Sequence, residues 1–127
     1  MRKLLLIFGL FISLTLSAQS THSFFFMFDT KAVALGKNTI FSNIQSCNST
    51  LNLFDGMSCF LLNDPITGGV FDIKNVEKDS ERNILVFTCV KRETKMDCMI
   101  ILEDEFVTFI YATVAYRFHI RWSNEMN

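Results

Sequence analysis

The stretch YRFHIRW, residues 116 to 122, decides the fold class of this chain. Apolar side chains occupy every second position from Tyr116 to Trp122, and Arg117, His119 and Arg121 fill the positions between them. Successive side chains of a strand point to opposite faces, so this pattern predicts a strand with one apolar face and one wet face.

Similar patterns precede this strand along the chain. Val70 to Val76 alternates in the same way, and Ile84 to Lys91 is rich in β-branched and aromatic residues. Turn residues recur at roughly 10-residue spacing, which is typical of all-β domains. The sequence predicts eight or nine short strands, at residues 23–28, 39–44, 50–54, 57–62, 70–76, 84–91, 97–102, 106–111 and 116–122.

These strands predict an all-β protein. We expect a single small antiparallel meander, either closed into a short lipocalin-like barrel or folded into a two-sheet sandwich. The apolar run at Ser23 to Phe28 suggests a strand covered on both faces. Asp55-Gly56 predicts a hairpin turn, and Ala112 to Ala115 a reversal without Gly or Pro. The one helical expectation is a short turn from Thr30 to Lys37, ended by Gly36.

The N-terminus has the layout of a cleavable signal peptide. Arg2 and Lys3 precede an uncharged apolar run from Leu4 to Leu16, and small residues follow at Ser17 and Ala18. Such a run is short of the ~20 residues that span a bilayer as a helix. We therefore predict a signal peptide over residues 1–18, a single β-rich domain over 19–127, and a secreted or periplasmic (cell-envelope) location.

The composition of the chain disfavours several classes of binding partner. Without Arg2 and Lys3, the mature chain has ten basic residues against 13 acidic ones, a net charge of about −3. It lacks the basic surface patch that is typical of nucleic-acid-binding proteins. It also lacks the polybasic cluster that is typical of membrane-surface proteins. No later segment is long and apolar enough for a membrane span. The 14 Phe residues, two of them in the leader, favour a packed domain over disorder.

Four cysteines lie in the predicted mature chain, which suggests two disulfides in an exported protein. Three pairings are open to them, and we expect Cys89–Cys98 together with Cys47–Cys59. A hairpin centred near Glu93-Thr94 would place Cys89 opposite Cys98, whereas the second pair follows mainly by elimination. The alternative is four free thiols. Zinc is disfavoured, because the chain has no C-x-x-C pair and its two His residues lie far apart.

The segment FDIKNVEKDSERNILVFTCVKRETKMDCMIILEDEFVTFIY, Phe71 to Tyr111, resembles a group of short, uncharacterised, exported bacterial β-rich proteins. In that group a strand leads to a charged turn, a strand ending in Cys, a polar hairpin and a second Cys. The likeness extends to Ile120. This chain departs from the pattern at Arg92 to Lys95, where the group has Asp-Gly. The resemblance implies an exported location and a β fold, and no activity.

The sequence offers few catalytic or ligand-binding candidates, and we expect no metal or other cofactor. His119 between two arginines is the one candidate general base within a strand, and a solvated strand histidine is the simpler interpretation. Glu103, Asp104 and Glu105 form an acidic run that we interpret as a turn, because neighbouring side chains in an extended chain point apart. The aromatic residues are mostly core; part of the set could form a binding surface, composed of Phe24, Phe25, Phe26, Phe28 and Trp122.

Three functions are compatible with these observations. The first is a non-enzymatic binding or interaction module with a protein partner in the envelope or extracellular space. The second is a carrier that holds a small apolar ligand in a Phe-lined barrel. The third, which we favour least, is a small hydrolase built around His119.

Overall fold

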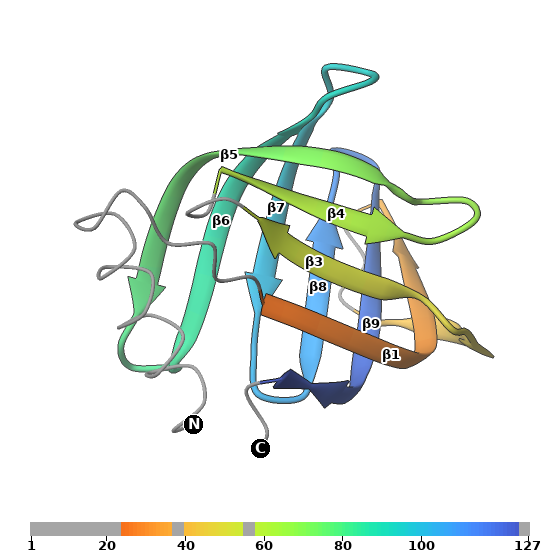
Figure 1. Cartoon of the computed structure of the whole chain (residues 1–127). Coiled ribbons are helices and arrows are strands. Elements are labelled where there is room, and N and C mark those ends of the chain that lie inside the picture. The colour runs from red at the N-terminus through yellow and green to blue at the C-terminus, as the bar shows by residue number, and fades with distance from the viewer. Residues whose placement is uncertain (1–23, 37–39, 55–57, 125–127) are drawn as a thin grey trace.

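The structure is a closed antiparallel β-barrel of eight strands with one additional strand (Figure 1). The computed structural model describes residues 24–36, 40–54 and 58–124; the predicted leader and the Asp55-Gly56 turn lie outside them. The strands are β1 (Phe24–Leu35), β2 (Ser42–Ser46), β3 (Thr50–Phe54), β4 (Cys59–Asn63), β5 (Gly69–Asp79), β6 (Ile84–Lys91), β7 (Asp97–Leu102), β8 (Phe106–Ile110) and β9 (Val114–Ser123). Of the two predicted architectures, the barrel is confirmed.

From β3 to β9 each strand pairs with the next one in the chain, which is an up-and-down meander. The ring closes where β1 pairs with β9, from Phe26 opposite Ser123 to Leu35 opposite Val114. Such closure leaves the eight barrel strands without a free edge, whereas the additional strand β2 pairs only with β1.

Strand β1 pairs with two different strands along the same side because it bends. Its first half pairs with β3 and its second half with the additional strand β2, while β9 runs along its other side. The register with β9 shifts on both sides of Phe28, as it does at β-bulges. The predicted helical turn at Thr30 to Lys37 is therefore wrong: residues up to Leu35 are strand, held by β2 and β9 on either side.

Side chains that point inward fill the barrel with aromatic rings. Phe60, Phe71, Phe87, Phe109 and Phe118 are 0–1% exposed. The ring centroids of Phe60 and Phe87 are 4.9 Å apart, and those of Phe109 and Phe118 are 5.6 Å apart. Edge-to-face pairs at this spacing are favourable for aromatic rings.

Strand β1 alternates like the others. Phe24, Phe26 and Phe28 are buried, whereas Phe25 and Met27 are half-buried on the outer face. The expectation that this run is covered on both faces is therefore wrong, and one face carries the core.

The hairpins agree with the sequence at two places. Cys89 stands opposite Cys98 across β6 and β7, as a hairpin centred near Glu93-Thr94 requires. Tyr111 N donates to Val114 O at 2.8 Å, which places the last reversal where it was predicted.

We predict that Phe118→Ala lowers the free energy of unfolding by about 3–5 kcal/mol, because Phe118 packs against Phe28 and Phe109 in the core. Phe25→Ala is the matched control, because its ring is half-buried on the outer face against Trp122. Urea unfolding of the two variants provides the measurement. Equal losses would contradict the assignment of inner and outer faces.

Candidate binding site at the barrel mouth

Polar side chains and exposed apolar side chains lie together at one end of the barrel. We call this end the mouth; it consists of residues 46–49, 63–68, 91–96 and 111–114, which connect β2 to β3, β4 to β5, β6 to β7 and β8 to β9. The turns lie together at this end because consecutive antiparallel strands reverse direction at each connection. Arg92 N donates to Val70 O at 2.8 Å, which joins the β6–β7 connection to the start of β5.

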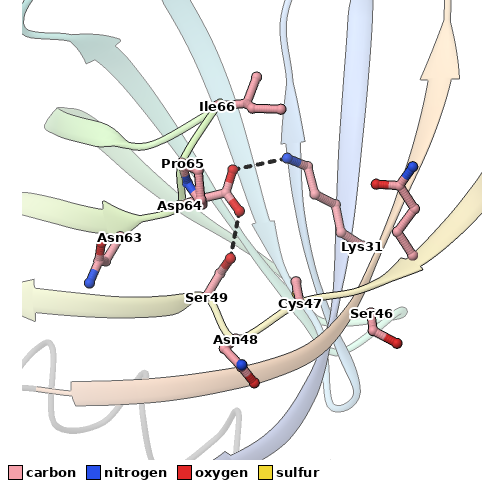
Figure 2. A pocket seen from close by; sticks show the side chains of 10 residues that line it. Lys31, Ser46, Cys47, Asn48, Ser49, Asn63, Asp64, Pro65 and Ile66 are labelled. Atoms are coloured by element: carbon pink, nitrogen blue, oxygen red, sulfur yellow. Dashed lines mark hydrogen bonds and ion pairs between the residues drawn. The ribbon is translucent and has the colours of Figure 1, made fainter.

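Asp64 is the centre of a hydrogen-bond cluster at the mouth (Figure 2). The Ser49 hydroxyl donates to Asp64 Oδ1 at 2.5 Å, and Lys31 Nζ donates to Oδ2 at 2.9 Å. The backbone N–H and the hydroxyl of Thr67 donate to the same Oδ2 at 2.9 and 2.5 Å. The side chain of Asp64 is only 3% exposed, so this carboxylate is buried but fully engaged.

Burial raises the pKa of the Asp64 carboxyl, and the hydrogen bonds from Ser49, Thr67 and Lys31 outweigh that effect. The pKa therefore lies well below its ordinary value, and Asp64 is ionised throughout the physiological range. The cluster ties the β4–β5 turn to β1 and to the residue before β3. Gly68 completes the turn, since a Cβ there would collide with the backbone of Asp64.

Lys31 also covers the aromatic interior at this end. Its ammonium lies 5.1 Å from the ring centroid of Tyr116 and 5.6 Å from that of Phe118. These are cation–π distances. Lys31 thus links the charged cluster to the packed core.

Two hollows open beside this cluster. The larger, about 520 Å³, lies between the connection to β3 and the β4–β5 turn, and amide and hydroxyl side chains line it: Gln45, Ser46, Asn48 and Asn63 (Figure 2). The smaller, about 160 Å³, is lined mainly by apolar and aromatic side chains: Ile66, Met96, Tyr111, Val114 and Tyr116. Ile66 is 85% exposed and Met96 49% exposed, so the rim presents apolar surface to water.

The predicted aromatic surface is divided between two faces of the sheet. Phe24, Phe26 and Phe28 are 1–2% exposed in the core and cannot line a binding surface. Phe25 and Trp122 remain on the outer wall, with ring centroids 6.3 Å apart. That part of the predicted surface stays a prediction, and none of the five residues lines the two hollows at the mouth.

His119 has a partner that the sequence did not indicate. Its Nδ1 lies 2.8 Å from Asp29 Oδ1, and its ring packs against Phe106. Asp29 lies where the β1–β9 register shifts, so this contact joins the two strands at the irregularity. Glu103 to Glu105 form the β7–β8 turn, at the end of the barrel opposite the mouth. In the described part of the chain, no three His, Cys, Asp or Glu side chains gather as metal ligands would.

The four cysteines are free thiols in the structure. Cys89 and Cys98 are directly opposite, and such positions have Cα atoms about 4.5–5.5 Å apart, within the range that a disulfide spans. Cys47 precedes β3, whereas Cys59 pairs with Phe54 at the far end of β3. The length of β3, five residues with four rises between them, alone separates the two by about 13 Å, so the predicted Cys47–Cys59 pairing does not fit this fold.

Sequence reasoning missed the Asp64 cluster. By residue type alone, Asn63-Asp64-Pro65 indicates only a break between strands and Thr67-Gly68-Gly69 only a turn. The pattern Asp-Pro-x-Thr does carry a signal, because an Asp side chain readily accepts hydrogen bonds from backbone groups two or three residues later. Nothing near Lys31 in the sequence points to Asp64, which is 33 positions away.

Comparison with known proteins identifies no relative: no family model matches the chain, and neither curated proteins nor solved structures give a significant match. No helix in residues 24–36, 40–54 and 58–124 has the length and apolar character needed to cross a membrane.

We predict that Asp64→Asn destabilises the protein by about 3 kcal/mol, because it leaves the mostly buried Lys31 ammonium without its counter-charge. The folded pKa of Asp64 is depressed, so the stabilisation is complete above the ordinary carboxyl pKa of about 3.9 and falls as the pH drops towards the folded value. The difference between wild type and variant should thus be constant from neutral pH to about pH 5 and shrink below about pH 4. Thermal unfolding against pH measures it, with Asp97→Asn at the exposed first residue of β7 as control. A difference that persists undiminished in acid would contradict this role.

Proposed function

We propose that the protein is exported and acts as a non-enzymatic binding or interaction module in the cell envelope or extracellular space, with the barrel mouth as its binding site. One observation carries this proposal: the interior is filled by Phe rings, while both hollows with an exposed apolar rim lie at the mouth. Exposed apolar side chains next to a concave surface are a common feature of interaction sites.

The packed interior argues against the alternative of a carrier with its ligand inside the barrel. Phe71 and Phe109 have ring centroids 5.4 Å apart, and both rings are almost completely inaccessible to water. A ligand inside would have to displace these rings, at a cost of several kcal/mol in lost packing. A ligand at the mouth would bind without displacing these rings.

The chemistry of the mouth supports binding over catalysis. A general acid or base needs a pKa near the working pH and a proton that can be exchanged. Asp64 accepts four hydrogen bonds and its pKa is held well below the ordinary value, so it neither releases nor takes up a proton near neutral pH. Its role is to hold the loops that shape the two hollows.

Export would also allow a Cys89–Cys98 disulfide, which we propose for the mature protein. Burial raises the pKa of both thiols to about 12, so neither is a reactive thiolate once the barrel has folded. The bridge would therefore form during folding in an oxidising compartment. It would close a short loop and add about 3 kcal/mol in the chain-entropy model.

A site-specific photocrosslinking experiment tests the binding site. A photoreactive amino acid in place of Ile66 at the mouth should give a distinct adduct in producing cells, whereas the same group in place of Thr88, exposed on the outer wall of β6, should not. Mass spectrometry of the purified products identifies the adducts. The same adducts from both positions, or none from Ile66, would reject the mouth as the site.

Mass spectrometry of the native protein without reduction tests export and the disulfide together. We expect a mature chain that begins at Gln19, two hydrogens lighter than the fully reduced form, with a peptide that links Cys89 to Cys98. Protein isolated from the cytosol with Met1 to Ala18 intact would overturn export. A mature chain with four alkylatable thiols after unfolding would remove the disulfide and leave export standing.

A further inference from the structure

We propose that the smaller hollow at the mouth binds an organic carboxylate that carries one aromatic ring or a similarly small apolar group. This inference rests on the proposed function, because it names the ligand class of the same mouth. The carboxylate would lie at Lys91 and the apolar group between Ile66, Met96 and Tyr116. These side chains come from the β4–β5 connection, the β6–β7 hairpin and strand β9.

Among the described residues, Lys91 is the one cation that lines the smaller hollow. Lys31 is engaged by Asp64, and Arg92 is paired with Asp72 at 2.6 Å. Among the described residues, Lys91 has no carboxylate within ion-pair distance, although it lines the hollow. A half-buried ammonium beside apolar walls binds an anion more strongly than an exposed one does, because its field is less screened.

The backbone positions Lys91 over the mouth. Gly69 has a φ of 153°, and a Cβ at this position would be 2.8 Å from Lys91 Cε, so the absence of a side chain leaves room for the lysine stem. The ammonium lies 5.8 Å from the ring centroid of Phe71, at the boundary between core and hollow. The charge thus lies next to the core, on a residue that is half-buried.

The walls favour an aromatic group. Tyr111 and Tyr116 have ring centroids 6.3 Å apart in an edge-on arrangement, which leaves ring surface for a third aromatic group. Burial raises the pKa of Tyr111, so its hydroxyl keeps its proton at neutral pH. Ile66 and Met96 at the rim would lose water-exposed apolar surface on binding, which favours an apolar ligand.

The volume limits the size of the ligand. The hollow measures about 160 Å³, close to the cavities of about 150 Å³ that accommodate a benzene molecule. Phe71 and the rings below it close the barrel beneath the hollow, so a long acyl chain has no space to enter. One ring or a short branched chain next to one carboxylate fits both limits. A free acid and the C-terminus of a peptide that ends in Phe share this chemistry.

The test compares an acid with its neutral counterpart on the full mature chain. 3-Phenylpropionate and 3-phenylpropan-1-ol are titrated while NMR follows the methyl groups of Ile66 and Met96. We expect saturable shifts at the mouth with the acid and at least about tenfold weaker binding of the alcohol, since a charge-assisted hydrogen bond is lost. Lys91→Met should weaken acid binding by a similar factor. Lys74→Met makes the same charge change on the outer wall and should leave it unchanged.

A second arm distinguishes the two sources of the carboxylate. A short peptide that ends in Phe is titrated as the free acid and as the C-terminal amide. Tighter binding of the free-acid peptide than of phenylpropionate assigns the site to a chain terminus, and the reverse order assigns it to a free small acid. Either order supports a carboxylate site, provided that the amide binds more weakly.

Three results would overturn the inference: no saturable shift at the mouth, equal binding of acid and alcohol, or unchanged acid binding by Lys91→Met. A folded Lys91→Met variant with wild-type unfolding behaviour is required for that comparison. If the carboxylate fails while Ile66 still gives its specific crosslink, only the ligand class is wrong. If both fail, the mouth is not the binding site.

Discussion

The pairing of β1 with β9 is the interaction on which the rest of this structure depends. It joins the first and last described strands into a ring, so all inward side chains share one core. Strand β1 must bend to reach β9 along its length while it pairs with β3 and then β2. The register shifts on either side of Phe28 supply that bend, and the Asp29–His119 contact holds the two strands together there.

Closure and the size of the inward side chains together decide where a ligand can bind. An eight-stranded barrel is just wide enough for side chains to fill, or for one small ligand to enter if the side chains are small. Here Phe occupies inward positions on β1, β4, β5, β6, β8 and β9. These rings pack against one another and fill the interior. Binding surface is therefore confined to the ends and outer wall, and the mouth combines two hollows with an apolar rim.

The mouth is held in shape by a buried charge pair that the surrounding groups satisfy. For a buried ion pair with few hydrogen bonds, the desolvation free energy exceeds the Coulombic attraction between the two charges. Four donors around Asp64 offset that cost, and the Lys31 stem covers the core at the same time. The loops at this end are consequently fixed to β1 and β3, so the surface of the mouth is preformed.

The sequence by itself determined the all-β class, the strands from Val70 onward and the Cys89–Cys98 register, because alternation and short hairpins depend only on neighbouring residues. Tertiary structure alone decided that the meander closes, that Thr30 to Leu35 is strand, and that Phe24, Phe26 and Phe28 face inward together. It also brought Lys31 to Asp64 and separated Cys47 from Cys59. The physical reason is that these features depend on which distant strand ends meet when a twisted sheet curls, and no local window of sequence encodes that geometry.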